Sequence, residues 1–250
     1  MAKLVQKSGY IKSGKASGYM RYIATREGVE KLAGNGAVTK GQRELIQKLL
    51  TDFPDAVELF EYEDYCKTPT LGTASAFISM ALDANFHEMD SESGYMQYIA
   101  TRPRVQKRGG HGLFSSATAV DLTSAMSELE AHEGNVWTII YSLRREDAVR
   151  LEYDNADAWR TLLMENAPTL AKSMKISLDN FHWYAAFHDE GHHPHIHMMV
   201  WSDDPKEGFL TKNGIAAMRS KLTNAIFRDE MQQIYERKDV AYSDLVEAAQ

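Results

Sequence analysis

The stretch NFHWYAAFHDEGHHPHIHMMVW (residues 180–201) is the most informative part of the chain for its fold. Five of the nine histidines lie between positions 188 and 197. Both flanks of this stretch, 180–188 and 195–201, are rich in the aromatic and β-branched residues that favour strands. The short segment between them contains Gly191 and Pro194. We therefore predict two antiparallel strands joined as a hairpin.

The alternation of side chains along these strands predicts a cluster of histidines. Side chains on a strand point to opposite faces in turn, so His195 and His197 share one face while Ile196 enters a core. Folding the hairpin brings His188 beside this pair. Three neutral imidazoles at one point suit a divalent transition metal, and a fourth position open to water or substrate would make the site catalytic. The sequence therefore predicts a metal centre at His188, His195 and His197.

The loop of the hairpin adds further candidates. Glu190 or Asp189 can supply a carboxylate ligand or orient an imidazole. His192 and His193 are expected to face solvent or substrate, because they lie in the turn and not on a strand.

Outward from the hairpin, the chain alternates strands and helices without a linker. Strands are predicted over 3–11 and 135–143. Helices are predicted over 17–27, 39–50 (with Thr39 as N-cap), 54–65, 69–84, 93–102, 117–132, 147–175 with an interruption near Pro168, and 212–237. The acidic run EYEDY (61–65) reads as a solvated helix face. This order predicts an α+β fold, a central antiparallel sheet flanked by helices. We expect one domain over 1–250, with 212–250 as a helical extension.

Composition excludes several classes of protein. The chain has 250 residues, of which 44% are hydrophobic and 25% charged, as in soluble globular proteins. No apolar run approaches the ~20 residues of a membrane span, and the N-terminus lacks the apolar core of a signal peptide. The single cysteine, Cys66, has no internal partner for a disulfide. We therefore expect a protein of a reducing cytoplasm with no membrane segment.

Charge is unevenly distributed along the chain. The net charge is −7, which alone argues against a nucleic-acid partner. However, residues 1–48 carry ten Lys and Arg against three Glu, and RPRVQKR (102–108) is basic again. Net acidity can coexist with a basic face that binds phosphates.

An internal repeat supplies candidate nucleophiles. SGYMRYIATR (17–26) returns as SGYMQYIATR (93–102), with nine of ten positions identical. One interpretation is a duplicated packing unit without chemistry, but the repeat keeps tyrosine, threonine and arginine. A tyrosine hydroxyl beside a metal can attack a phosphate. The candidate tyrosines are Tyr19, Tyr22, Tyr95 and Tyr98, and Arg21 and Arg26 can clamp phosphates.

Together these motifs resemble a known family. Histidine-hydrophobic-histidine is the HUH signature of metal-dependent single-strand endonucleases. GYMRYIATREGVEKL (18–32) resembles the tyrosine motif of MobP- and MobL-type conjugative relaxases of Gram-positive mobile elements. FHDEGHHPHIHMM (187–199) resembles their histidine motif, and GGHGLF (109–114) and GFLTKNGIAAMRS (208–220) also look like that group.

The resemblance implies a function and assigns roles. It implies metal-dependent nicking of one DNA strand at a transfer origin, through a 5′-phosphotyrosine, for conjugative mobilisation. Tyr22 would be the nucleophile, with Tyr98 as the alternative that the duplication creates. Mn²⁺ or Mg²⁺ would be the ion in use, with Zn²⁺ as a further candidate. Its partners would be single-stranded DNA, relaxosome accessory proteins and a coupling protein. From the residues themselves, and not from the resemblance, we expect Glu190 to be a catalytic group. On the same ground we expect DNA contacts from Arg21, Arg26, Arg102, Arg104, Lys107 and Arg108.

Two other functions stay open at this point. His193, His195 and His197 also fit the spacing of histidine-triad nucleotide hydrolases and transferases, in which a histidine is the nucleophile and no metal is needed. A non-catalytic DNA- or metal-binding accessory protein would use the basic segments but would need no tyrosine at the metal.

Overall fold

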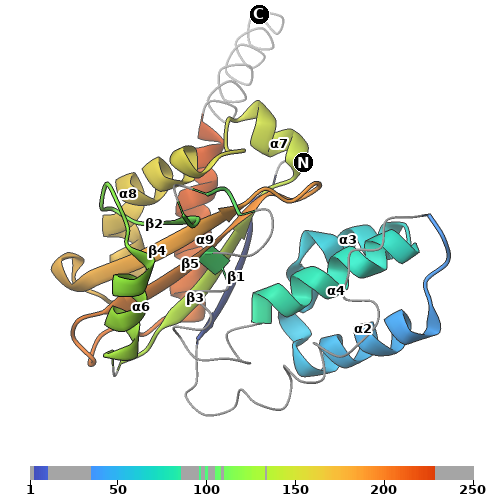
Figure 1. Cartoon of the computed structure of the whole chain (residues 1–250), viewed down its shortest axis with the longest axis horizontal. Helices are drawn as coiled ribbons and strands as arrows, with labels where there is room; N and C mark the ends of the chain where they lie inside the picture. The colour runs from blue at the N-terminus through green and yellow to red at the C-terminus, as the bar shows by residue number, and fades with distance from the viewer. Residues whose placement is uncertain are drawn as a thin grey trace, which may run out of the picture.

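The computed structural model describes residues 3–10, 35–85, 96, 99–100, 105–107, 110–132 and 134–228. Its centre is a five-stranded antiparallel sheet with the order β1-β3-β5-β4-β2 (Figure 1). The strands are β1 (Val5–Tyr10), β2 (Leu113–Phe114), β3 (Trp137–Ser142), β4 (Phe181–His188) and β5 (His195–Ser202). The predicted α+β fold with a central antiparallel sheet is confirmed.

The predicted hairpin is β4 and β5. The register pairs Ala186 with His197 and His188 with His195, so the strands separate only at the loop after His188. Because side chains alternate, Ile196 and Met198 enter one core and the histidines face the other side of the sheet.

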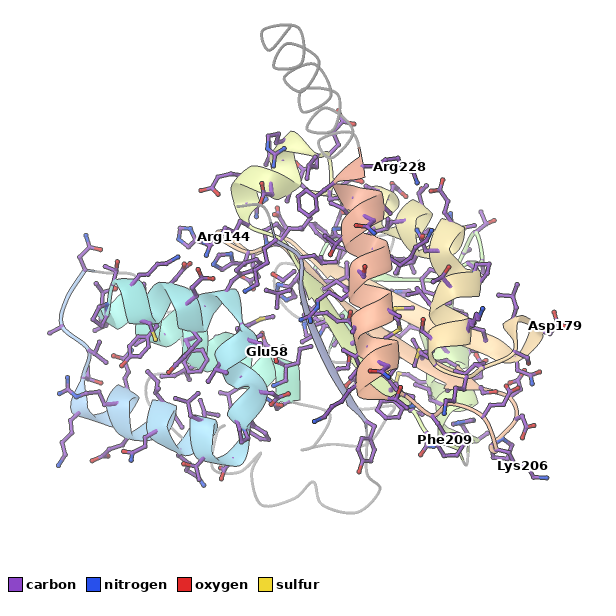
Figure 2. The ribbon with its side chains drawn as sticks, turned by 180° about the vertical axis from the view of Figure 1, so that it is seen from behind. Glu58, Arg144, Asp179, Lys206, Phe209 and Arg228 are labelled. Atoms are coloured by element: carbon purple, nitrogen blue, oxygen red, sulfur yellow. The ribbon has the colours of Figure 1, made fainter. Side chains whose placement is uncertain are left out.

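Two helices cover the face of the sheet opposite the histidines. They are α8 (Ala156–Ser173) and α9 (Lys212–Ile226), and both are seen in front of the sheet in Figure 2. The Asn155 and Thr211 side chains cap their first turns by accepting from backbone N–H groups. The core between these helices and the sheet includes Trp159, Met218 and Leu222, all fully buried.

The histidine face is covered in two parts. Over one part, α6 (Leu122–Glu130) packs with Met96, Ile99 and Ala100 of the second repeat against Met199 and Trp201. The other part is contacted by a helical body that lies beside the sheet (Figure 1). This body consists of α2 (Lys40–Asp52), a 3-10 turn over Pro54–Glu58, α3 (Phe60–Lys67) and α4 (Leu71–Asn85). This body has its own core, which also contacts Ile140 of β3. A buried Lys7 of β1 pairs with Asp55 of the 3-10 turn at 3.4 Å.

Some elements end elsewhere than predicted. Thr39 caps α2 as expected, through a capping box with Gln42. The predicted helix over 54–65 is divided at Leu59, which is extended. The predicted helix over 117–132 begins only at Leu122, because the preceding residues form a loop whose carbonyls accept from Arg160.

The predicted long helix over 147–175 is two helices. The shorter is α7 (Arg145–Arg150), and the break before α8 includes Glu152, whose φ of 62° is left-handed. Pro168, where we expected an interruption, lies inside α8. Of the predicted extension 212–250, residues 229–250 lie outside the described part of the chain. Within the described ranges, no helix has the length and apolar composition needed to cross a membrane.

Candidate metal centre

Three imidazoles converge at the open end of the hairpin. His188 ends β4, and His195 and His197 begin β5; all three are at most 1% exposed. The ring centroids lie 4.6 Å (His188–His197), 5.0 Å (His195–His197) and 5.2 Å (His188–His195) apart. One ring nitrogen of each lies within 4.8 Å of the others, the single such group found among the described residues. The structure thus brings the three predicted ligands together.

Backbone carbonyls determine which nitrogen of two rings can bind a metal. His188 Nε2 lies 2.9 Å from the carbonyl oxygen of Ile99, and His195 Nδ1 lies 3.0 Å from that of His193. A carbonyl oxygen only accepts hydrogen bonds, so these nitrogens carry the protons. The lone pairs are then on His188 Nδ1 and His195 Nε2. Metal-ligating histidines usually have this arrangement, in which the non-ligating nitrogen donates to an acceptor.

These residues fit a divalent transition metal. The donor set is three buried imidazoles, two of them in a defined neutral tautomer, which suits Mn²⁺ or Zn²⁺ better than a hard ion such as Mg²⁺. Three protein ligands also leave coordination positions for water or substrate, as in catalytic metal sites.

The loop between the ligands is fixed by Arg145. Its guanidinium donates to the Asp189 carboxylate at 2.6 Å, to the Gly191 carbonyl at 3.1 Å and to the Glu190 carbonyl. Its own backbone N–H donates to the carbonyl of His192 at 2.8 Å. Asp189 is therefore held at the surface by an arginine. Glu190 is buried, but its carboxylate is not part of the group of converging ligand atoms.

His193 occupies a position that the sequence did not predict. It is buried, and its Nε2 donates to Asp64 Oδ2 of α3 at 2.7 Å. Burial lowers the pKa of His193, and this effect outweighs the neighbouring Asp64 carboxylate, which by itself would raise that pKa. Burial alone would raise the pKa of Asp64, but hydrogen bonds from His193 and Arg144 lower it instead.

Two expectations are corrected by this contact. His193 does not face solvent or substrate, and the acidic run 61–65 is not simply a solvated helix face, because Glu61 is buried and Asp64 binds His193. The two partners are 129 positions apart, so no local pattern signals the pair.

The second repeat reaches the metal centre through its described residues. Met96, Ile99 and Ala100 are fully buried, and the Ile99 carbonyl accepts from His188. Val105 forms a β-bridge with His188, and Lys107 is exposed nearby in the chain. Tyr98 and Tyr22 lie outside the described residues, as do Arg21, Arg26, Arg102, Arg104 and Arg108.

The fold and the site together define a class. An antiparallel sheet that carries histidine-hydrophobic-histidine on one strand and a third histidine on its neighbour is the arrangement expected of an HUH-type relaxase. The family model for MobL relaxases matches residues 1–250, so the chain belongs to the MobL relaxases. This membership supports a DNA-nicking function. Neither the curated proteins nor the solved structures contain a match.

Proposed function

We propose that this protein nicks one DNA strand at a specific site by a metal-dependent transesterification. The observation that carries the proposal is the buried group of His188, His195 and His197 in a chain of the MobL relaxase family. In the proposed reaction a tyrosine oxygen attacks the scissile phosphorus. A phosphorus–tyrosine oxygen bond forms as the bond to the 3′-oxygen breaks. The departing oxygen takes a proton, leaving a 3′-hydroxyl and a 5′-phosphotyrosine.

The three histidines would hold the divalent ion. Mn²⁺ fits both the imidazole donors and the family resemblance; Zn²⁺ fits the donors as well, and Mg²⁺, which the resemblance also implies, would bind more weakly. Such an ion neutralises charge on the phosphate and favours the phenolate form of a nearby tyrosine. Tyrosine needs this help because its unperturbed pKa is about 10. We assign phosphate contacts to Arg21, Arg26, Arg102, Arg104, Lys107 and Arg108.

Tyr22 is the proposed nucleophile, by the resemblance of its motif to that of relaxases. Tyr98 remains the alternative. One observation favours it: the carbonyl of its chain neighbour, Ile99, accepts from His188. Glu190 is proposed as a catalytic group that orients an imidazole of the site, and its burial within the loop between the ligands is compatible with that role.

The proposed setting is conjugative mobilisation in the bacterial cytoplasm. There the protein would act on single-stranded DNA at a transfer origin, together with relaxosome accessory proteins and a coupling protein.

The histidine-triad alternative is disfavoured by one contact. It requires His193 to act with His195 and His197, but the His193 ring is directed to Asp64 of α3, and His188 takes its place in the buried group.

The testing experiment uses single-stranded oligonucleotides that carry a candidate origin, labelled at either end. With Mn²⁺, we expect wild type to release the 5′-labelled fragment with a free 3′-hydroxyl. The 3′-labelled fragment should stay covalently bound to the protein and migrate with it on a denaturing gel. Tyr22→Phe keeps the ring and removes the attacking oxygen, so it should form no adduct. Tyr98→Phe should keep most of the activity, and Tyr10→Phe, at the end of β1, is the control.

The other outcomes would change either the nucleophile or the function. A full adduct from Tyr22→Phe would exclude Tyr22, and loss only in Tyr98→Phe would transfer the role to the second repeat. Binding without any adduct in wild type would indicate the accessory-protein alternative.

A further inference from the structure

We propose that α3 of the helical body positions the metal ligand His195, and that it acts through His193. The proposal rests on the metal centre of the proposed function. It assigns a role to Asp64, Phe60 and His193, none of which lies in the group of ligand atoms. The role is that of positioning residues: they hold the main-chain carbonyl that receives the proton of His195 Nδ1.

The His193 ring is fixed on two sides by α3. Its plane stacks on Phe60 with ring centroids 5.2 Å apart and an interplanar angle of 22°. Its Nε2 donates to Asp64 Oδ2 at 2.7 Å, and only 5% of the side chain is exposed. A ring held by one stacking contact and one charge-assisted hydrogen bond has little rotational freedom. The backbone of residue 193 is therefore fixed in place as well.

Asp64 is in turn held by Arg144, which follows β3 and is labelled in Figure 2. Arg144 Nη1 donates to Asp64 Oδ1 at 3.2 Å, Nη2 lies 3.3 Å from Glu63, and the guanidinium carbon lies 4.7 Å from the centre of the Phe60 ring. The two oxygens of Asp64 thus bind separate partners. This network connects α3 to the sheet at the end where the metal ligands lie.

The position of one carbonyl matters because it selects a tautomer. A neutral imidazole carries its proton on either nitrogen, and only a ring protonated at Nδ1 offers Nε2 to a metal. The His193 carbonyl accepts from Nδ1 at 3.0 Å and so favours this form before any metal arrives. If this carbonyl moves, His195 Nδ1 loses its hydrogen-bond acceptor. The ring must then adopt its binding tautomer and orientation as the metal binds, which weakens metal affinity. Disturbed orienting partners of this kind typically lower metal affinity about 10–100-fold.

Mn²⁺ binding to the whole chain, measured by calorimetry, tests the proposal. We expect Asp64→Ala and His193→Ala each to weaken binding about ten-fold. Asp64→Asn keeps an acceptor oxygen for His193 and should restore most of the affinity. The matched control is His192→Ala, because His192 is an exposed loop histidine outside the ligand group. It should bind Mn²⁺ as wild type does.

The double variant adds a sharper criterion. Because Asp64 and His193 act through one contact, their effects should not add, and the double variant should lose no more than either single one. Fully additive losses, unchanged affinity in both single variants, or an equal loss in His192→Ala would overturn the proposal.

A second readout needs no metal. Long-range nitrogen–proton NMR spectra of the metal-free chain report the tautomer of His195. We expect the Nδ1–H form in wild type and Asp64→Asn, and a mixture in Asp64→Ala. Wild-type tautomer in folded Asp64→Ala would refute the positioning role. His195→Ala distinguishes failure of the positioning role from failure of the metal centre: if this variant binds Mn²⁺ as wild type does, His195 is not a metal ligand.

Discussion

At the metal centre, the sequence predicts the three histidine ligands but not all of the contacts that orient their rings. The alternation of a strand is local, so the shared face of His195 and His197, and the approach of His188 across a short loop, follow from the pattern alone. The pattern does not predict the backbone carbonyls that accept hydrogen bonds from His188 and His195. His188 donates to Ile99, 89 positions away. His195 donates to the carbonyl of His193, whose ring binds Asp64, 129 positions away. Such contacts depend on tertiary packing, which one sequence does not reveal.

Alanine substitution of the ligands gives a prediction at this scale. His188→Ala, His195→Ala and His197→Ala each remove one imidazole of three, so each should weaken Mn²⁺ binding at least ten-fold by calorimetry. His182→Ala is the control. It lies on β4 as well, but at the far end from the site, where its Nε2 contacts Asp203 at 2.7 Å. Retained affinity in all three ligand variants would exclude the site.

Capping residues and side-chain periodicity predicted the helices and strands better than a single helix-breaking residue did. Thr39 and the alternating strands gave α2 and the hairpin, because these signals satisfy backbone groups or bury one face. Pro168 was misleading. Proline removes one hydrogen bond in a helix, because it has no N–H to donate to the carbonyl four residues earlier, here that of Met164. Pro168 and Met164 are both exposed, so water can bond to this carbonyl instead. The actual break, between α7 and α8, comes instead at Glu152 and the Asn155 cap.

The contact between α8 and α9 yields a stability prediction. A Cβ added at Gly214 would lie 2.4 Å from the Ser173 carbonyl oxygen, a backbone atom that cannot move without shifting α8. Gly214→Ala should therefore reduce the free energy of unfolding by about 1–3 kcal/mol in urea denaturation. Gly41→Ala is the matched control, because nothing lies within 4 Å of its added Cβ. It should be neutral or stabilise by up to about 1 kcal/mol. Equal stability of the two variants would refute the close approach.

In the whole molecule, the helical body lies beside the sheet, and α8 and α9 cover one face of the sheet (Figures 1 and 2). The sequence predicted the antiparallel sheet but not that α3 would contact the ligand loop, since nothing in the run 61–65 identifies its partner. Because the net charge is −7, the proposed DNA binding requires local clusters of basic residues that attract the phosphates.

Salt dependence of DNA binding tests that distribution of charge. If about five phosphates are neutralised, the log–log slope for single-stranded DNA should be roughly −3.5. Replacing Arg102, Arg104, Lys107 and Arg108 by glutamine should flatten the slope toward roughly −0.7 if all four contact phosphates. The control removes equal charge from exposed lysines on the α8–α9 side: Lys172, Lys175, Lys206 and Lys212. An unchanged slope in the first variant would assign the strand to another surface, such as residues 3–26.

Metal-dependent nicking through the three histidines is tested most directly by the amount of covalent protein–DNA adduct as a function of added Mn²⁺. This amount is measured on denaturing gels for metal-stripped wild type and His197→Ala. We expect no adduct without metal, an amount of adduct that rises with Mn²⁺ in wild type, and an amount at or near background in His197→Ala. A wild-type level of adduct in the metal-free protein, or in His197→Ala, would contradict metal-dependent nicking through these histidines.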